Sequence, residues 1–370
     1  MEAFVKPRVA PGARTLEARW YNAPDVFERE RERIFAREWI CVGRLEKLER
    51  AGDYFLAEIA GESLIVTRGK DDRVRAFYNV CRHRGTRICT ETPGRFAGSI
   101  QCPYHAWTYA LDGMLISARM MADVPGFDRA DFPLHEAALA TFEGFVFVNL
   151  EREPQPFVQA FAPLVGRFTR WHIAELRAVR TTTYDVTCNW KLVFQNYSEC
   201  YHCPLLHPQL DELSPSDSGR NDLTEGPFLG GYSELRGHGT SLTKTGTTTR
   251  ASIGEIDGDD LNRVYYYTIF PSLLLSLHPD YVMAHYVQPV APNRTKIVCA
   301  WLFDREEIAA PGFDPSDAVD FWDLTNRQDW RINEQTQLGT TSRAYSPGPY
   351  SDNEGLLAAF DRRYLSIMSA

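Results

Sequence analysis

Cysteine and histidine residues are concentrated in one stretch that could hold a metal centre. Residues 81–105 read CRHRGTRICTETPGRFAGSIQCPYH, with Cys81 and His83 at one end and Cys102 and His105 at the other. Thiolate sulfur and imidazole nitrogen are the protein ligands of zinc and of some iron–sulfur clusters. Because 18 residues separate the two Cys/His pairs, each pair is expected on a loop of its own.

The order of the ligands within each loop separates these kinds of metal centre. Zinc loops usually pair cysteine with cysteine, about two to four residues apart, and histidine with histidine. Here each loop mixes one cysteine with one histidine, as in a Rieske-type [2Fe–2S] cluster, where two thiolates hold one iron and two imidazoles the other. We therefore predict such a cluster, with zinc as the alternative. Imidazole ligands raise its potential toward roughly −150 to +300 mV, which suits transfer of single electrons to an iron–oxygen site.

A second group of possible ligands lies at 196–208, which reads NYSECYHCPLLHP. Four residues separate His202 from His207, and Glu199 precedes His202 by three. Residues five apart do not share a face of a regular helix, but Pro204 should break a helix here. A bent segment could then turn both imidazoles toward one metal. Two histidines and a carboxylate form the facial triad of O2-activating Fe(II) enzymes, so we predict a mononuclear iron site. No spacing supports His238, His278 or His285 as a ligand.

The elements that must position these residues change type along the chain. Residues 1–38 form an N-terminal segment with a helix at about 25–38, whose charged run 28–33 predicts a solvated face. From 39 to 150, short alternating apolar runs between Gly, Asp and Pro predict an antiparallel β domain. The polar, proline-bearing EREPQP after Leu150 marks the boundary with a second domain, 151–370.

The second domain mixes predicted helices with predicted strands. Residues 214–260 are poor in large apolar residues, so we expect a lid, a binding loop or a disordered segment there. The whole chain is therefore expected to be α+β, with helices on one side of an antiparallel sheet. The predicted helices lie at about 157–172, 190–201 and 315–338, and the predicted strands at 181–187, 264–277, 281–290 and 295–303.

Composition narrows the class of protein without naming a reaction. The 370 residues carry a net charge of −9, which argues against a general nucleic-acid binder. No apolar run approaches the roughly 18 residues of a membrane helix, and the N-terminus lacks a signal-peptide core, so we expect a cytoplasmic protein. The 8 cysteines are too sparse for a disulfide scaffold. Two are predicted ligands, and the other six are expected to pack in the interior.

The motif C-R-H-R-G … C-P-Y-H-A-W resembles the N-terminal domain of the oxygenase component of Rieske non-haem iron oxygenases, and the resemblance spans about residues 15–338. It implies a Rieske domain at 39–150 and a helix-grip catalytic domain at 151–370. It also implies that the third iron ligand is an Asp on a late helix shortly before a Glu. Asp329, five residues before Glu334, matches that placement, and Asp323 is the alternative.

The resemblance further implies how the sites cooperate. Family members assemble as homotrimers, in which a carboxylate links a cluster imidazole of one subunit to an iron-ligand imidazole of the next. Glu199 occupies that bridging position, so the predicted electron path runs from His105 to Glu199 to His202. A separate NAD(P)H-dependent reductase, with or without a ferredoxin, would supply electrons, because no dinucleotide-binding fingerprint is present.

The substrate class is predicted from one residue that differs from the pattern of the aromatic-ring dioxygenases. Many aromatic-ring dioxygenases have Asp at the bridging position, whereas Glu199 lies in E-C-Y-H-C, which resembles the branch acting on quaternary ammonium compounds such as carnitine and glycine betaine. We expect monooxygenation with N-demethylation. The alternatives are an aromatic ring-hydroxylating oxygenase and, in another class, an electron-transfer Rieske protein.

Two further groups of residues bear on partners and substrate. Arginines in the cluster loops could dock an acidic electron donor or form local salt bridges; they are Arg82, Arg84, Arg87 and Arg95. Aromatic residues on the late strands could line a pocket for a quaternary ammonium group or an aromatic ring; they are Tyr265, Tyr266, Tyr267, Phe270, Tyr281, Tyr286, Trp301 and Phe303.

Overall fold

The computed structural model describes residues 3–237 and 239–369, so His238 lies outside the described residues. The chain forms two compact units. Met1–Glu30 and Pro163–Ala370 make up the larger unit, and Arg31–Ala162 the smaller one. Both contain antiparallel sheets, and the larger unit adds long helices, so the predicted α+β class is confirmed. The predicted domain limits at 38 and 150 stay predictions.

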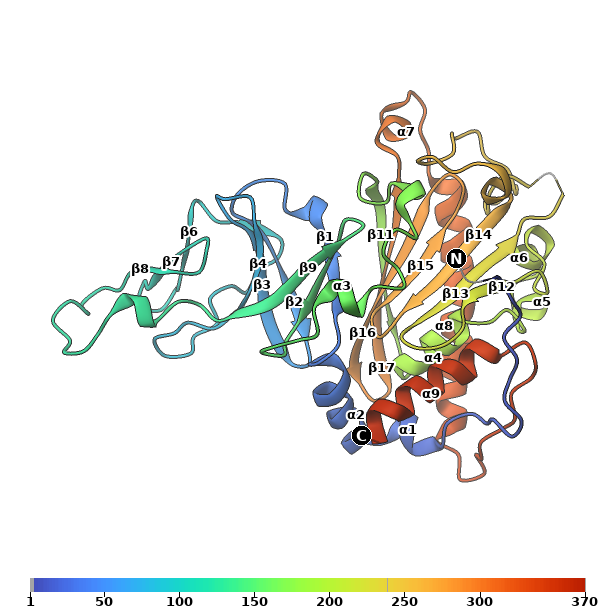
Figure 1. Ribbon diagram of the computed structural model, residues 1–370, viewed down its shortest axis with the longest axis horizontal. Coiled ribbons are helices and arrows are strands. Elements are labelled where there is room, and N and C mark those ends of the chain that lie inside the picture. Colours follow the sequence, from blue (N-terminus) through green and yellow to red (C-terminus); the bar gives the residue numbers. More distant parts are fainter. Residues whose placement is uncertain (1–2, 238, 370) are drawn as a thin grey trace. The chain divides into compact units, whose positions relative to one another are not determined.

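The smaller unit is built from two antiparallel sheets (Figure 1). Buried Ile65, Phe77, Ile100 and Tyr109 join them in one apolar core. The seven-stranded sheet has the order β1 (Ile40–Arg44), β10 (Phe145–Asn149), β9 (Glu136–Phe142), β4 (Val74–Tyr78), β3 (Glu62–Arg68), β2 (Asp53–Ile59) and β5 (Gly94–Arg95); the small sheet has the order β6 (Ser99–Gln101), β7 (Thr108–Ala110) and β8 (Leu115–Ser117). The one α-helix described in this unit is α3 (Phe157–Ala160).

The larger unit is a seven-stranded antiparallel sheet with helices packed against it (Figure 1). Its strand order is β11 (Arg177–Val186), β17 (Arg294–Phe303), β16 (Val282–Ala291), β15 (Leu273–Leu277), β14 (Arg263–Ile269), β13 (Phe228–Glu234) and β12 (Arg220–Leu223). Helix α4 (Trp190–Tyr197) packs on β16, on α8 (Ser316–Thr340) and on α9 (Gly355–Ser369). The short helices are α1 (Ala18–Asn22), α2 (Pro24–Glu30), α5 (Cys203–Leu206), α6 (Pro208–Leu213) and α7 (Arg305–Ala309).

Several predicted elements differ from the observed ones for local reasons. The helix expected at 157–172 ends at Ala160, because Pro163 cannot continue it and Gly166 adopts a left-handed φ of +76°. The segment 214–260 contains β12 and β13. The glycines of β13 interrupt the alternation of large apolar residues by which a strand is predicted. They are needed for steric reasons, because a Cβ on Gly230 would lie 2.0 Å from the Tyr266 carbonyl oxygen. Small residues are therefore required where β13 meets β14.

The run 28–33 is not a solvated face throughout, because Glu30 is fully buried. Lys191 Nζ donates to Glu30 Oε1 over 2.6 Å, and Trp190 Nε1 donates to Glu30 Oε2 over 2.9 Å. Tyr364 of α9 also donates to this carboxylate, over 2.6 Å. A buried carboxylate is tolerated when it is paired and hydrogen-bonded in this way. Glu30 thus ties α2, α4 and α9 together.

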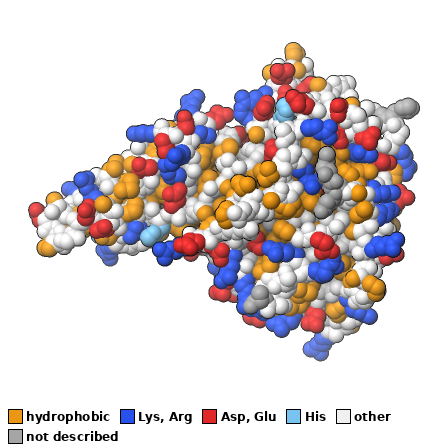
Figure 2. All heavy atoms as spheres, viewed as in Figure 1, with side chains coloured by type: hydrophobic (Ala, Val, Ile, Leu, Met, Phe, Trp, Pro, Cys, Tyr) orange, Lys and Arg blue, Asp and Glu red, His pale blue; other side chains and the backbone are white. Residues whose placement is uncertain are grey.

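Acidic and basic side chains are interspersed on the face shown in Figure 2, where neither sign forms a broad field. None of the described helices is both long and apolar enough to cross a membrane.

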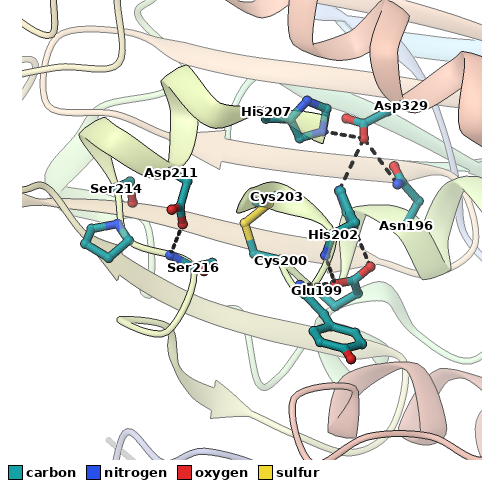
Figure 3. The surroundings of a disulfide bond; sticks show 12 residues. Asn196, Glu199, Cys200, His202, Cys203, His207, Asp211, Ser214, Ser216 and Asp329 are labelled. Carbon is teal, nitrogen blue, oxygen red and sulfur yellow. Dashed lines mark hydrogen bonds and ion pairs between the residues drawn. A yellow bond between two sulfur atoms is a disulfide. The ribbon is translucent and has the colours of Figure 1, made fainter. Parts of the chain in front are cut away.

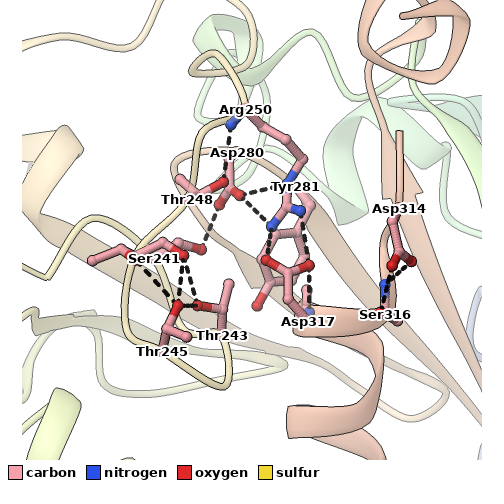
Figure 4. A network of polar contacts seen from close by, with 12 residues as sticks. Ser241, Thr243, Thr245, Thr248, Arg250, Asp280, Tyr281, Asp314, Ser316 and Asp317 are labelled. Carbon is pink, nitrogen blue, oxygen red and sulfur yellow. Dashed lines mark hydrogen bonds and ion pairs between the residues drawn. The ribbon is translucent and has the colours of Figure 1, made fainter. Parts of the chain in front are cut away.

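The stretch from Ser241 to Arg250 is fixed to the body of the larger unit (Figure 4). Arg250 makes a two-pronged contact with Asp317 at the start of α8, at 2.8 and 3.0 Å, and donates to Asp280 over 2.9 Å. Ser241 Oγ also donates to Asp280, over 2.5 Å. The structure therefore favours a fixed loop here over a disordered one.

Replacing Arg250 by Ala should cost on the order of 3 kcal/mol of unfolding free energy, because its side chain is only 8% exposed and Asp280 would be left buried without a cationic partner. Urea unfolding measures this loss. Arg294→Ala is the control, since its two-pronged pair with Asp185 is more than half exposed, and its loss should stay below about 1 kcal/mol. Equal losses of unfolding free energy in the two variants would contradict the conclusion that Arg250 fixes this loop.

Candidate iron centres

Two loops of the smaller unit bring the four predicted cluster ligands together. Cys81 and His83 lie after β4, and Cys102 and His105 lie directly after β6. The two imidazole rings have centroids 4.8 Å apart. The two thiols form a hydrogen-bonding contact with each other. All four side chains therefore meet at one place, as the spacing predicted.

Burial differs between the thiols and the imidazoles. Both thiols lie in the apolar core, whereas His83 is exposed. Tyr109 Oη lies 3.4 Å from Cys81 Sγ, and Trp107 stacks on His83 at 4.8 Å. Burial raises the pKa of the Cys102 thiol, so a thiolate here requires a nearby cation. The donor set fits a [2Fe–2S] cluster, with thiolates on the buried side and imidazoles on the exposed side.

The predicted mononuclear site joins separate segments of the larger unit (Figure 3). His202 and His207 flank the short helix α5, and Asp329 lies on α8. His207 Nε2 lies 2.8 Å and His202 Nε2 3.3 Å from the same oxygen, Asp329 Oδ1. One ligand atom from each residue lies within 4.8 Å of the other two. The fold thus assembles two histidines and one carboxylate.

The bend between the histidines arises differently from the prediction. Helix α4 ends at Tyr197, well before Pro204. Pro204 instead occupies the first turn of α5, where proline is tolerated because its missing N–H has no partner in the helix. Pro204 begins α5, and the chain leaves this helix at His207, whose φ of −128° and ψ of 60° lie outside the helical region.

The outer nitrogen of each imidazole is held by an acceptor. His202 Nδ1 donates to Glu199 Oε1 over 2.5 Å, and His207 Nδ1 donates to Gln328 Oε1 over 2.7 Å. Placing the proton on Nδ1 leaves the Nε2 lone pair free for a metal. Asn196 Nδ2 donates to Asp329 Oδ1 over 3.2 Å. This donor set suits Fe(II), and Gln328 is a supporting residue that the sequence analysis missed.

The electrostatics of the triad favour a cation between its members. Burial lowers the pKa of His202, but hydrogen bonds to Asp329 and Glu199 outweigh it and raise this pKa to about 10. Burial opposes ionisation of Asp329, yet its hydrogen bonds with the two imidazoles lower its pKa. Before a metal binds, a proton therefore occupies the site, and iron must displace it.

The other candidate ligands are engaged elsewhere. Asp323 accepts from Tyr184 over 2.6 Å and from Arg327 over 2.8 Å, which makes it a structural carboxylate. Burial lowers the pKa of His285 to about 4, and its Nε2 bonds Asn326 Oδ1 at 3.1 Å. Neither belongs to the set of ligand atoms that meet at Asp329.

The iron triad lines a cleft of the larger unit with walls from α4, α8, β13 and β14. Of the eight predicted aromatic lining residues, Tyr266 alone is part of this lining. Tyr265 and Tyr267 point to the opposite face of β14, because side chains alternate along a strand. Tyr197 and Trp322 also line the cleft and were missed. Trp322 precedes Asp329 by two helical turns, a spacing that could have revealed it.

Cys200 and Cys203 do not pack as separate interior thiols. They form a disulfide, with Cα atoms 4.9 Å apart, that encloses the turn containing His202 (Figure 3). The remaining six cysteines are free and buried. Cys89 packs in the cluster-domain core, as predicted.

The four cluster-loop arginines have local partners. These contacts support the prediction of local salt bridges and packing. Arg82 donates to the Pro133 carbonyl, Arg84 lies over the Tyr104 ring, Arg87 lies 3.6 Å from Glu58, and Arg95 pairs with Asp53.

The fold and the two sites define a Rieske-type oxygenase with a cluster domain and a mononuclear iron domain. Residues 38–128 match the family model of the Rieske [2Fe-2S] domain, and residues 173–370 match that of the ring hydroxylating alpha subunit (catalytic domain). The chain belongs to the family of Rieske non-haem iron oxygenases, as oxygenase component. It is therefore an enzyme whose cofactors are a [2Fe–2S] cluster and mononuclear iron, with O2 as co-substrate. It works with a reductase on a small-molecule substrate.

Several oxygenase subunits are similar to this chain over most of its length. The glycine betaine monooxygenase oxygenase subunit of Chromohalobacter salexigens is 30% identical, over 93% of this chain and 83% of its own. The carnitine monooxygenase oxygenase subunit of Escherichia coli K12 is 31% identical, over 90% and 85%. A quaternary ammonium Rieske monooxygenase, described in terms of carnitine oxidation by gut microbiota and inter-subunit electron transfer, superposes with a TM-score of 0.82 at 26% identity, over 96% of each chain.

Replacing Asp329 by Ala should remove the mononuclear iron and leave the cluster. Iron content should fall from about three to about two atoms per chain, while the visible absorbance of the cluster persists. Asp323→Ala is the matched control on the same helix, and it should keep about three. Unchanged iron in the Asp329 variant would show that this carboxylate is not the third ligand.

Proposed function

We propose that this chain is the terminal oxygenase of a multicomponent system that monooxygenates a small quaternary ammonium compound or betaine, with oxidative N-demethylation as the outcome. The observation that carries the proposal is a group of aromatic rings beside the iron triad. Tyr197, Tyr266 and Trp322 line the same cleft as His202 and Asp329. We call these three rings the aromatic group.

The aromatic group suits a cation that has no N–H to donate. The rings of Tyr197 and Tyr266 lie 6.1 Å apart, and those of Tyr266 and Trp322 lie 6.4 Å apart. Trp322 Nε1 donates to Tyr281 Oη over 2.7 Å, which fixes the orientation of the indole. A quaternary ammonium group cannot hydrogen-bond, so it is attracted mainly by aromatic faces, by about 2 kcal/mol or more when desolvated. The names of the relatives point to the same chemistry.

The predicted ligands take defined roles in this proposal. His202, His207 and Asp329 hold the mononuclear iron, which activates O2 when bound and leaves open coordination positions for it. Asn196 and Gln328 orient these ligands through the hydrogen bonds described above. The cluster ligands are Cys81, His83, Cys102 and His105.

Glu199 is proposed to carry the electronic connection between subunits of a homotrimer. Its carboxylate already bonds His202 Nδ1 and accepts from the backbone N–H of Tyr201. These contacts fix the side chain at the ligand imidazole. In the trimer, the second carboxylate oxygen would accept from His105 of the neighbouring subunit, which gives the path His105–Glu199–His202.

The electron supply completes the proposal. An NAD(P)H-dependent reductase, directly or through a ferredoxin, would reduce the cluster. We place the system in the cytoplasm, where that cofactor pool is available. An electron carrier without oxygen chemistry would have no use for the His202–His207–Asp329 site.

Product analysis tests the substrate class. Purified enzyme with a surrogate reductase should consume O2 and release formaldehyde with glycine betaine or carnitine, while simple aromatic compounds should give neither a phenol nor a diol. Ring products from aromatic substrates would replace the proposal with aromatic hydroxylation. If none of the compounds stimulates O2 uptake, the proposed substrate class is overturned.

Two Trp322 variants isolate the aromatic face. Trp322→Leu removes the π system, and Trp322→Phe keeps one, while both lose the bond to Tyr281. Trp322→Leu should raise KM for the ammonium substrate about 10-fold to 30-fold relative to Trp322→Phe, since about 1.4 kcal/mol corresponds to tenfold. Equal KM values in the two variants would argue against ammonium binding at this ring.

Glu199→Gln should keep both metal sites and abolish turnover. The amide oxygen can still accept from His202 Nδ1, but the amide carries no charge to link a second imidazole. Iron content and cluster absorbance should be unchanged, while oxidation of the reduced cluster by O2 and substrate becomes at least about 100-fold slower. Glu212→Gln, an exposed glutamate on nearby α6, is the control. Near-normal rates in the Glu199 variant would reject the bridging role.

A further inference from the structure

Among the described residues, the wall of the iron cleft contains one side chain with a permanent positive charge. Of the described residues that line the cleft, Lys6 is the one Lys or Arg. It makes no ion pair with any described residue. The carboxylates of Glu199 and Asp329 belong to the iron site and are already bonded to imidazoles. Asp352 is the remaining charged lining residue.

The backbone on both sides of Lys6 is anchored to the cleft. Val5 and Asn221 exchange backbone hydrogen bonds of 2.8 and 2.7 Å, which adds the N-terminal segment to β12. Phe4 packs edge-on against Tyr232 with ring centroids 4.8 Å apart. On the other side, Pro7 packs so closely on Gly355 that a Cβ there would lie 2.4 Å from the Pro7 carbonyl oxygen. The backbone of Lys6 is therefore held at the cleft from both sides. The dark blue N-terminal trace follows this course beside β12 in Figure 1.

The lining changes character between its buried and its exposed parts. Trp322 is 5% exposed, and Tyr197 and Tyr266 are half-buried, whereas Lys6 and Asp352 are exposed. The aromatic group is contributed by α4, α8 and β14, which also carry or adjoin the iron ligands. A ligand whose methyl groups face the iron would thus place its cationic end among aromatic rings. Its other end would reach the charged, exposed part of the lining.

We propose that Lys6 binds the carboxylate of the substrate, so that the cleft selects zwitterionic betaines over quaternary ammonium cations that lack a carboxylate. This inference rests on the proposed function and adds a second recognition group to it. An ammonium–carboxylate pair forms charge-assisted hydrogen bonds, and at an exposed position it contributes a modest, salt-dependent part of the affinity. The same positive charge would repel a simple cation.

Equilibrium binding to the iron-loaded, reductant-free enzyme under anaerobic conditions tests this inference without turnover. The ligands are glycine betaine, carnitine and choline, which has the trimethylammonium group but no carboxylate. Lys6→Met should raise the Kd of glycine betaine and carnitine about fivefold, which is the upper end of what an exposed ion pair contributes. The Kd of choline should stay unchanged or fall. Lys6→Arg should restore betaine binding to within about twofold, because it restores the charge. Raising the ionic strength should weaken betaine binding in the natural protein more than in Lys6→Met.

Asp352→Asn is the control at the same part of the cleft. It should leave the preference for betaines over choline intact or increase it. If it instead weakens all three ligands equally while Lys6→Met changes none, the ammonium lies at Asp352 and the inference is overturned. Parallel changes for betaines and choline in Lys6→Met would overturn it as well. Failure of the natural protein to bind any of the three would instead reject the proposed function. Unchanged iron content and cluster absorbance show that each variant is intact.

Discussion

Three polar groups converge on one carboxylate oxygen, Asp329 Oδ1: His207 Nε2 at 2.8 Å, His202 Nε2 at 3.3 Å and Asn196 Nδ2 at 3.2 Å. A carboxylate removed from water in this way is tolerated only when its bonding partners are fixed. Those partners come from α4 and from the two ends of α5, whereas the carboxylate comes from α8. The iron site therefore depends on how firmly α4 and α8 are held against the same sheet.

In the interior of the larger unit, polar contacts as well as apolar packing hold these helices in place. Glu30 receives bonds from α4 and α9 in a fully buried position. The chain just before α4 is fastened to α8, since Gln337 accepts from the Asn189 backbone N–H over 2.8 Å. A buried polar group that lacks a partner destabilises the fold, whereas a network in which every group is paired holds its members in one geometry. These contacts fix the rotation of α4, and this rotation aims Asn196 and Tyr197 at the cleft.

The two metal centres differ in how much of the chain they require. The cluster ligands sit on two loops within 25 residues of sequence, each closed by its own backbone hydrogen bonds, so local geometry nearly defines the site. The iron site and its cleft draw on residues from the N-terminal segment to α9. Substrate recognition can thus change through distant parts of the larger unit while the cluster domain stays the same. This agrees with a family in which related cluster and iron domains serve different substrates.

Local spacing in the sequence predicted the four cluster ligands and the pair His202 and His207, because residues expected to hold the same metal centre are close along the chain. The β character of the smaller unit followed from alternation in the same way. Asp329 had to be taken from a resemblance, since nothing in its own neighbourhood distinguishes it from Asp323. Only the tertiary structure decided that Asp323 bonds Tyr184, that Glu30 is buried against Lys191, and which of three consecutive tyrosines lines the cleft. Strand register, helix rotation and the path of the N-terminal segment bring Trp322 and Lys6 to one cleft, and these follow from packing over hundreds of residues rather than from any local pattern.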